Sequence, residues 1–292
     1  MFHAADPTAG LLESVREARF SHGLRCPRCG SPACIRWGSF RGRLRYRCRD
    51  CDRTFNDLTG TPFAYTKRLA YWVPYAAAMA RSDTVRHAAK RVGIHPSTAF
   101  RWRHRLLAAL RDQDREELRG WIELGSAWFA YSEKGRTPAD RPPRRRGLDE
   151  ILARTDGVNV LVACDRSGGV VTGVIGRTNR RRFSADDLEH ALTGRLARDV
   201  TLLAADGWFG GPSIFADRLG RPFIDTRPRR RGASPLAHVR ATFAYNLRLM
   251  AWIERFRGVA TRYLRNYLLW HRLLDRQYRL GFALLAFQWP LD

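Results

Sequence analysis

The chain has 292 residues, of which 45% are hydrophobic, so it can bury one large core or two to three small ones. Its 52 basic residues outweigh 28 acidic residues and give a formal charge of +24 at pH 7. This composition excludes a disordered chain, and the sign and size of the charge predict a polyanionic partner such as nucleic acid.

All but three of the basic residues are arginines, whose planar guanidinium binds phosphate in two places and stacks on bases. Codon bias in a GC-rich genome is one explanation for arginine over lysine, but it does not explain the surplus of positive charge. The N-terminus lacks a signal-peptide pattern, and no apolar stretch reaches the roughly 18 residues of a membrane span. We therefore expect a cytoplasmic, nucleoid-associated protein with reduced cysteines and no membrane partner.

Four of the six cysteines form two C-x2-C pairs separated by 18 residues. Two residues between thiols allow each pair to reach one tetrahedral ion, and the gap is long enough for a hairpin that joins the pairs. The pattern predicts a structural zinc site, with an iron site or accidental cysteines as the alternatives. The four ligands are Cys26, Cys29, Cys48 and Cys51. Cys34 and Cys164 lie outside the pattern and are expected to be small buried apolar side chains.

Basic and apolar residues alternate strictly within the gap between the cysteine pairs. On a strand, one set of side chains faces the zinc core, and the other forms an arginine face that we expect to meet phosphate. Neutralisation of the negative zinc–thiolate cluster is the alternative role for these guanidinium groups. The core-facing set is Leu44, Tyr46 and Cys48. The arginine face consists of Arg41, Arg43, Arg45, Arg47 and Arg49.

Helical spacing replaces this pattern from about residue 67 to residue 110. With Gly93 as the turn residue, apolar side chains fall at positions that pack two helices together, as in a helix-turn-helix. The second helix is expected to begin at Pro96 or Ser97. The packing positions are Ala88, Ala89, Val92, Ile94, Ala99 and Trp102.

Polar side chains on this second helix are expected to contact double-stranded DNA. Ser97, Thr98 and Arg101 lie near its N-terminus and are placed to touch base edges. Arg103 and Arg105 are better placed for backbone phosphate. An ordinary helical hairpin is the alternative, because the spacing by itself is only moderately specific. The positive charge and the preceding cysteine pattern favour DNA binding.

The C-terminal part of the chain alternates between strands and helices, and three of its loops concentrate arginines. These loops begin at Arg141, Arg177 and Arg227, and each is either a solvated surface or a nucleic-acid contact. A short apolar run ends at Asp206, which predicts a buried strand that presents a carboxylate at the sheet edge. Enzymes that cut nucleic acids hold two magnesium ions with two or three such oxygen ligands, so one aspartate alone is not sufficient.

Taken in order, these motifs resemble the bacterial insertion-sequence DDE transposases of the ISXO-like group. The resemblance spans roughly residues 26 to 275 and is carried by "TAFRWRHR", "YSEKG", "VLVACDRSG", "AADG" and, most specifically, "RFRGVATRYLRNYLLWHR". It implies a multidomain α/β protein with a small zinc ribbon, a helical helix-turn-helix domain and an RNase H-like mixed-sheet domain. The expected ranges are a leader at 1–20, the ribbon at 21–66, the helix-turn-helix domain at 67–115 and the RNase H-like domain at 116–292.

The resemblance also implies which residues hold the catalytic metal, and two of the expected ligands are missing. The position of the family's first catalytic aspartate corresponds to Gly125 in this sequence, and the position of its third metal ligand corresponds to Phe243. Met250 stands at the position of an expected lysine, and only the second aspartate is kept, as Asp206. Hydrogen and a benzyl group provide no oxygen to Mg²⁺, so we expect the cleavage activity to be impaired.

Two neighbouring residues are candidates to replace the missing ligands. Glu123 shares a strand face with Gly125, and Asn246 lies one helical turn past Phe243. Either spacing displaces an oxygen by several ångströms, whereas catalytic geometry tolerates only about 0.5 Å.

The expected function is therefore binding of insertion-sequence inverted repeats as a homodimer or a higher synaptic oligomer. The alternative is an active transposase that uses Mg²⁺ to cleave DNA and transfer strands, with Asp206 as one ligand. A product with no selected role is the third possibility.

Overall fold

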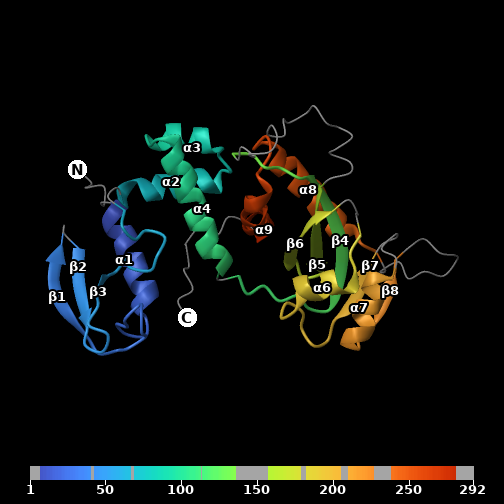
Figure 1. The fold of residues 1–292 in the computed structure, drawn as a ribbon, viewed down its shortest axis with the longest axis horizontal. Helices are drawn as coiled ribbons and strands as arrows, with labels where there is room; N and C mark the ends of the chain where they lie inside the picture. Colours follow the sequence, from blue (N-terminus) through green and yellow to red (C-terminus); the bar gives the residue numbers. More distant parts are fainter. Residues whose placement is uncertain are drawn as a thin grey trace, which may run out of the picture. The chain divides into compact units, whose positions relative to one another are not determined.

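The computed structural model describes residues 7–40, 43–66, 69–112, 114–135, 157–178, 182–204, 210–226 and 238–280. The chain divides into two compact units, and the boundary falls at residue 113: the second unit runs from Asp114 to Leu280. The elements of both units follow one another from blue to red in Figure 1. Within the ranges given above, no helix is both long enough and apolar enough to cross a membrane.

The first unit begins with a helix and a three-stranded antiparallel sheet of order β1-β2-β3. The elements are α1 (Pro7–Phe20), β1 (Cys34–Phe40), β2 (Arg43–Cys48) and β3 (Thr54–Asn56). Along β2 the side chains alternate as predicted, because Tyr46 and Cys48 are buried while the arginines between them remain partly exposed. The small core of the sheet consists of Cys26, Tyr46, Cys48 and Phe55.

Helix α1 lies within residues 1–20, which the sequence assigns to a leader. Arg16 Nη2 lies 3.0 Å from Asp57 Oδ2, and Arg19 Nη1 donates a hydrogen bond to the backbone oxygen of Asp57 at 2.6 Å. The ring of Phe20 packs edge-on against Tyr46, with 6.2 Å between the ring centroids. Polar contacts and the ring of Phe20 thus join the helix to the ribbon, and Val15 is buried.

Three longer helices complete the described part of the first unit: α2 (Trp72–Ala80), α3 (Val85–Val92) and α4 (Pro96–Asp112). The hydroxyl of Thr84 accepts a hydrogen bond from the backbone N–H of His87 and caps the start of α3. At the other end, Gly93 adopts φ of +72°, a left-handed conformation that ends the helix and turns the chain. A short 3₁₀ turn, Leu69–Tyr71, precedes α2.

Four of the six predicted packing positions are buried, and Ile94 and Trp102 are partly buried. Ala88 and Ala89 of α3 and Ala99 of α4 are buried, and the two helices are in contact. Trp102 stacks on Trp72 of α2, with 4.2 Å between ring centroids and 14° between ring planes. The indole therefore joins α4 to α2.

The second unit contains a five-stranded mixed sheet of order β6-β5-β4-β7-β8. The strands are β4 (Trp121–Ala130), β5 (Gly157–Asp165), β6 (Val170–Thr178), β7 (Thr201–Ala204) and β8 (Phe223–Asp225). The first three strands pair antiparallel, whereas β7 runs parallel to both β4 and β8. This mixed sheet confirms the expected α/β class.

Helices cover both faces of this sheet. They are α6 (Ala185–Leu192), α7 (Gly211–Leu219), α8 (Arg240–Glu254) and α9 (Leu264–Leu280), with a 3₁₀ turn at Thr261–Tyr263. Ile122 and Leu124 of β4 belong to the core formed with α6 and α7. Because side chains alternate along a strand, Glu123 and Gly125 face the opposite side, where α8 packs on β4.

Candidate functional site

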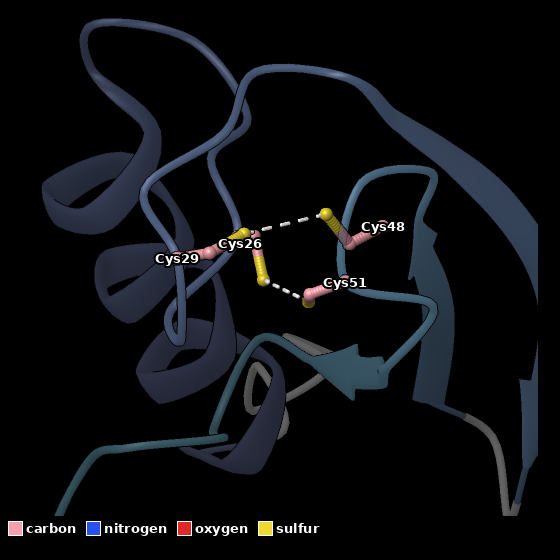
Figure 2. Close-up of side chains that lie close together, drawn as sticks. All are labelled: Cys26, Cys29, Cys48 and Cys51. Carbon is pink, nitrogen blue, oxygen red and sulfur yellow. Dashed lines mark hydrogen bonds between the residues drawn. The ribbon is translucent and has the colours of Figure 1, made fainter.

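Four thiols gather in the first unit, as Figure 2 shows. The Sγ atoms of Cys26 and Cys51 lie 3.6 Å apart, as do those of Cys29 and Cys48, and all four sulfurs lie within 4.8 Å of one another. A tetrahedral zinc site with Zn–S bonds of about 2.3 Å has sulfur–sulfur edges of about 3.8 Å. The four thiols therefore fit one tetrahedral ion. Within the described ranges, no other group of three or more His, Cys, Asp or Glu side chains could hold a metal.

Tight turns bring each cysteine pair to this point. In the first, the backbone N–H of Gly30 donates to the oxygen of Cys26, and the N–H of Cys26 donates to Ser31, both at 2.9 Å. In the second, the N–H of Cys48 donates to the oxygen of Arg53 at 3.0 Å. Gly30 has φ of +73°, which a residue without a side chain adopts at little cost.

The thiols differ in acidity because their surroundings differ. A hydrogen bond from the backbone N–H of Cys51 lowers the pKa of Cys48 to about 6. The backbone N–H of Ser31 acts to lower the pKa of Cys29, but desolvation and the neighbouring thiols raise it to about 12. Cys48 is therefore already a thiolate at neutral pH, and Cys29 must release its proton when a metal binds.

The two remaining cysteines stay outside this cluster. Cys34 packs against the ribbon core and its thiol donates to the backbone oxygen of Ser31 at 3.4 Å. Burial raises the pKa of Cys34 to about 11, so it is a poor nucleophile at neutral pH. Cys164 is buried within β5. Cys164 is thus buried as predicted, whereas Cys34 is only partly buried.

The arginine face of β2 is present, although its guanidinium groups already have partners in the protein. Arg43 donates to the oxygen of Thr66 at 3.4 Å, and Arg45 donates to the hydroxyl of Thr54 at 3.2 Å. Arg47 Nε donates to Asp52 Oδ1 at 2.6 Å. Arginine carries five N–H donors, so these contacts do not use the full hydrogen-bonding capacity of each guanidinium. Arg41 lies outside the described residues.

Helix α4 presents some of the expected DNA contacts at its N-terminus. Ser97 and Arg101 are exposed and Thr98 is half-buried. The hydroxyl of Ser97 lies 2.8 Å from His95 Nδ1, and the backbone N–H of Ser97 donates to the same nitrogen at 3.2 Å. His95 therefore fixes the start of the helix and the orientation of the Ser97 hydroxyl.

Arg103 corrects the sequence interpretation. Its side chain is fully buried, and its Nη2 donates to the backbone oxygen of Asp83 at 2.6 Å. A guanidinium that supports the protein's own backbone is not placed to reach a phosphate. Arg105 is exposed and donates to the oxygen of Ala64 at 2.8 Å, so its predicted phosphate contact remains a prediction.

In the second unit, helix α8 occupies the space in front of Gly125. A Cβ atom at Gly125 would lie 2.8 Å from Thr242 Cβ and 3.1 Å from Thr242 Oγ1. Thr242 is itself buried, and its hydroxyl donates to the oxygen of Val239 at 3.0 Å. A carboxylate at position 125 would therefore need α8 to move away from the sheet.

Glu123 has a role that the sequence did not indicate. Its Oε2 accepts hydrogen bonds from the backbone N–H groups of Ala241 at 2.7 Å and Thr242 at 3.2 Å. Its Oε1 lies 3.3 Å from Arg166 Nε and 3.6 Å from His238 Nδ1. The fully buried carboxylate thus caps the N-terminus of α8, where the helix dipole favours negative charge. The sequence around Glu123 did not predict this role, because the helix that the residue caps lies more than a hundred residues further along the chain.

Helix α8 also carries Asn246, Phe243 and Met250, whose side chains differ in exposure and in hydrogen bonding. Asn246 Nδ2 donates to the backbone oxygen of Ser126 on β4 at 3.0 Å. Its buried Oδ1 has no hydrogen-bond partner among the described residues. Phe243 and Met250 are exposed by 66% and 43%. Asp206 lies outside the described residues, as do the arginine loops that begin at Arg141 and Arg227.

No protein-family profile matches the chain. The chain is 36% identical over 166 residues to a protein of Halobacterium salinarum described as an uncharacterized protein in transposable element ISH50. The match covers 55% of this chain and 55% of that protein, so the chain spans about half the length of the curated relative it matches.

Two solved structures show a weak likeness. A pre-cleavage Mos1 transpososome is 13% identical, with a TM-score of 0.23, over 73% of this chain and 78% of that one. The Mos1 mariner paired end complex with Mn is 11% identical, with a TM-score of 0.26, over 75% and 79% of the two chains. These scores are too low to support any conclusion about this protein.

Proposed function

We propose that this chain is a transposase-related protein that binds double-stranded DNA at the inverted repeats of a mobile element. The relationship to the protein in transposable element ISH50 is the observation that carries the proposal. The charge of +24 and the predominance of arginine supply the electrostatic attraction that duplex DNA requires.

The first unit supplies the DNA contacts in this proposal. Helix α4 enters the major groove with its N-terminus, where exposed Arg101 donates to a base edge and Ser97 is held in place by His95. The arginine face of β2 contacts backbone phosphates and fixes the register of the protein on the duplex. In this arrangement, α4 determines the sequence preference, and the arginines of the ribbon account for most of the salt dependence of DNA binding.

Cys26, Cys29, Cys48 and Cys51 would hold a structural zinc ion. Bound zinc would tie the two cysteine turns together as a closed four-thiolate site. The apolar core of the ribbon is small, with Tyr46 and Phe55 as its large members, so the ion is needed to keep the arginine face in shape. Zinc therefore acts on DNA binding only through the fold of the ribbon.

We further infer that DNA cleavage is lost. The close approach of Thr242 to Gly125 supports this inference, because it leaves no room for an oxygen ligand at the first expected metal position. An exposed phenyl ring at Phe243 supplies no ligand at the third position. Glu123 is committed to the N-terminus of α8, so it is not free to replace either one.

One observation favours the alternative function of an active transposase. The amide oxygen of Asn246 is buried without a hydrogen-bond partner among the described residues. Orphaned buried oxygens are rare and require an explanation, and a divalent cation is one. In this alternative, Asp206 and Asn246 would hold Mg²⁺, which would supply Lewis-acid chemistry for cutting the bound ends.

The test uses the full chain and a labelled duplex that carries the inverted repeat from the DNA flanking the gene. The proposal predicts tighter binding to the repeat than to a scrambled duplex, a steep loss of affinity with salt and a homodimer or higher oligomer on two ends. Under conditions of full binding, Mg²⁺ or Mn²⁺ should leave the DNA intact. Nicking that disappears in the Asp206→Ala variant would establish the alternative. Equal affinity for both duplexes, unchanged by Arg101→Ala, would contradict specific recognition.

A further inference from the structure

Two exposed aromatic rings lie on the arginine face of the ribbon. Backbone pairing places Phe40 of β1 opposite Arg43 of β2, and opposite residues of a strand pair point to the same side of the sheet. The guanidinium of Arg47 lies over the ring of Trp37, with 4.6 Å between Cζ and the ring centroid. The cysteines, Tyr46 and Phe55 occupy the other side. Aromatic rings and guanidinium groups are therefore interleaved on one face, which we call the Trp37 face.

The strand geometry supports this placement. The register of β1 against β2 shifts between Arg36 and Ser39, and Gly38 within this bulge has φ of +74°. A bulge of this kind redirects the neighbouring side chain and increases the local twist. Trp37 is 45% exposed and Phe40 is 59% exposed, although both are large apolar residues on a small sheet. Burial in the ribbon core therefore does not explain either ring.

The Trp37 ring is held ready to stack. Arg47 covers one side of the indole, and the carboxylate of Asp52 holds Arg47 through contacts of 2.6 Å at Nε and 2.5 Å at Nη2. A large part of the residue remains exposed to solvent. A ring that is already fixed loses little entropy when a second planar group stacks on it.

From these contacts we infer that the Trp37 face binds unpaired nucleotides of a DNA strand. Exposed aromatic rings bind base faces, and every unpaired base offers such a face regardless of its identity. In a duplex the bases stack on one another, so their faces are not accessible to Trp37 and Phe40. The arginines between the rings pair with the phosphates that follow each base. A charged face without aromatic rings would suffice for duplex phosphate, so the rings favour a single strand.

This inference rests on DNA as the partner of the proposed function and adds a second substrate class, the unpaired strand at an opened or frayed end. Base recognition by α4 and base stacking by Trp37 and Phe40 depend on different side chains, although the arginines of β2 contact phosphates in both. Each activity can therefore be removed without the other.

The experiment measures fluorescence anisotropy of a labelled oligothymidylate and of a duplex of the same length, with the zinc-loaded full chain. Trp37→Leu removes the ring but keeps an apolar side chain, and it should weaken oligothymidylate binding at least about fivefold while duplex binding changes little. Trp37→Phe should retain most of the affinity, and Phe40→Ala should weaken it again. Arg101→Ala should show the reverse pattern and weaken only duplex binding.

Controls separate the two proposals. Phe243→Ala removes an exposed aromatic residue of the other unit and should leave oligothymidylate binding unchanged. Bound zinc and circular dichroism of each ribbon variant should match the wild type. Oligothymidylate binding that is absent, or that survives Trp37→Leu and Phe40→Ala, overturns the inference and leaves duplex binding untouched. Strong oligothymidylate binding without duplex binding overturns the proposed function instead.

Discussion

Thr242 on α8 fills the space in front of Gly125 on β4, at the position where the family resemblance places the first catalytic aspartate. The two residues approach so closely that a Cβ at Gly125 would lie 2.8 Å from Thr242 Cβ. The same helix end is capped by Glu123, two residues earlier on the strand. A glycine and a glutamate on one face of β4 thus seat α8 on the sheet, and both serve packing.

Restoring the missing aspartate should not restore cleavage. Gly125→Asp should lower the stability of the second unit by more than the roughly 1–3 kcal/mol typical of overpacking, because it adds a carboxylate to a packed interface. Thermal unfolding measures this change. The smaller variant Gly125→Ala should be destabilised as well, and Thr242→Gly in the same chain should recover part of the loss. Additive effects of the two substitutions would show that the contact is not the cause.

Glu123 should behave as a structural residue. Glu123→Ala removes the cap of α8 and leaves Arg166 and His238 without their carboxylate, so we expect a loss of about 3 kcal/mol in stability. Chemical denaturation is the measurement. Glu117→Ala is the matched control, because its ion pair with Arg119 is exposed and contributes about 0.5 kcal/mol. A loss of DNA nicking in Glu123→Ala with unchanged stability would instead indicate a metal ligand.

Arg101 and Arg103 are two residues apart and should respond to substitution in opposite ways. Arg101 is exposed at the start of α4, so Arg101→Ala should weaken repeat binding about tenfold and leave stability unchanged. Arg103 is buried against the oxygen of Asp83, so Arg103→Ala should cost about 2 kcal/mol of stability. Binding titrations and thermal unfolding of the two variants distinguish these roles. If both variants changed DNA affinity and stability to the same extent, a DNA-contacting role for Arg101 and a structural role for Arg103 would be refuted.

Zinc uptake should release fewer than four protons near neutral pH. The pKa of Cys48 is lowered to about 6, so this thiol has lost its proton above that pH, whereas Cys29 with a pKa of about 12 is still protonated. Calorimetric titration with zinc at about pH 7.5 in buffers of different ionisation enthalpy counts the protons. As pH falls through 6, Cys48 becomes protonated in the metal-free ribbon, and the count should rise by one. A release of four protons at the higher pH would contradict the assigned acidity.

Local patterns in the sequence predicted the features that depend on nearby residues. The alternation along β2 and the turn at Gly93 follow from neighbours within a few positions, and the four-cysteine cluster follows from two short C-x2-C motifs. The sequence did not indicate α1, which an ion pair between Arg16 and Asp57 joins to the ribbon.

Contacts between distant parts of the chain account for the other differences. The guanidinium of Arg103 donates to the backbone oxygen of Asp83, which lies 20 residues earlier, between α2 and α3. The carboxylate of Glu123 accepts from the start of α8, which lies 118 residues further on. Charged residues are expected at the surface unless a partner is known, and neither partner is visible in the local pattern. The aromatic rings of the Trp37 face were missed for a similar reason, since strand pairing places them beside the arginines.

The central claim is DNA binding without DNA cutting, and one nicking assay tests it most directly. The full chain is held at saturation on an end-labelled duplex with the inverted repeat, in the presence of Mn²⁺, and the strands are separated on a denaturing gel. We predict a fully bound and uncut duplex, with no difference between the wild type and Asp206→Ala. Cleavage at the repeat end by the wild type that is abolished in Asp206→Ala would contradict the account.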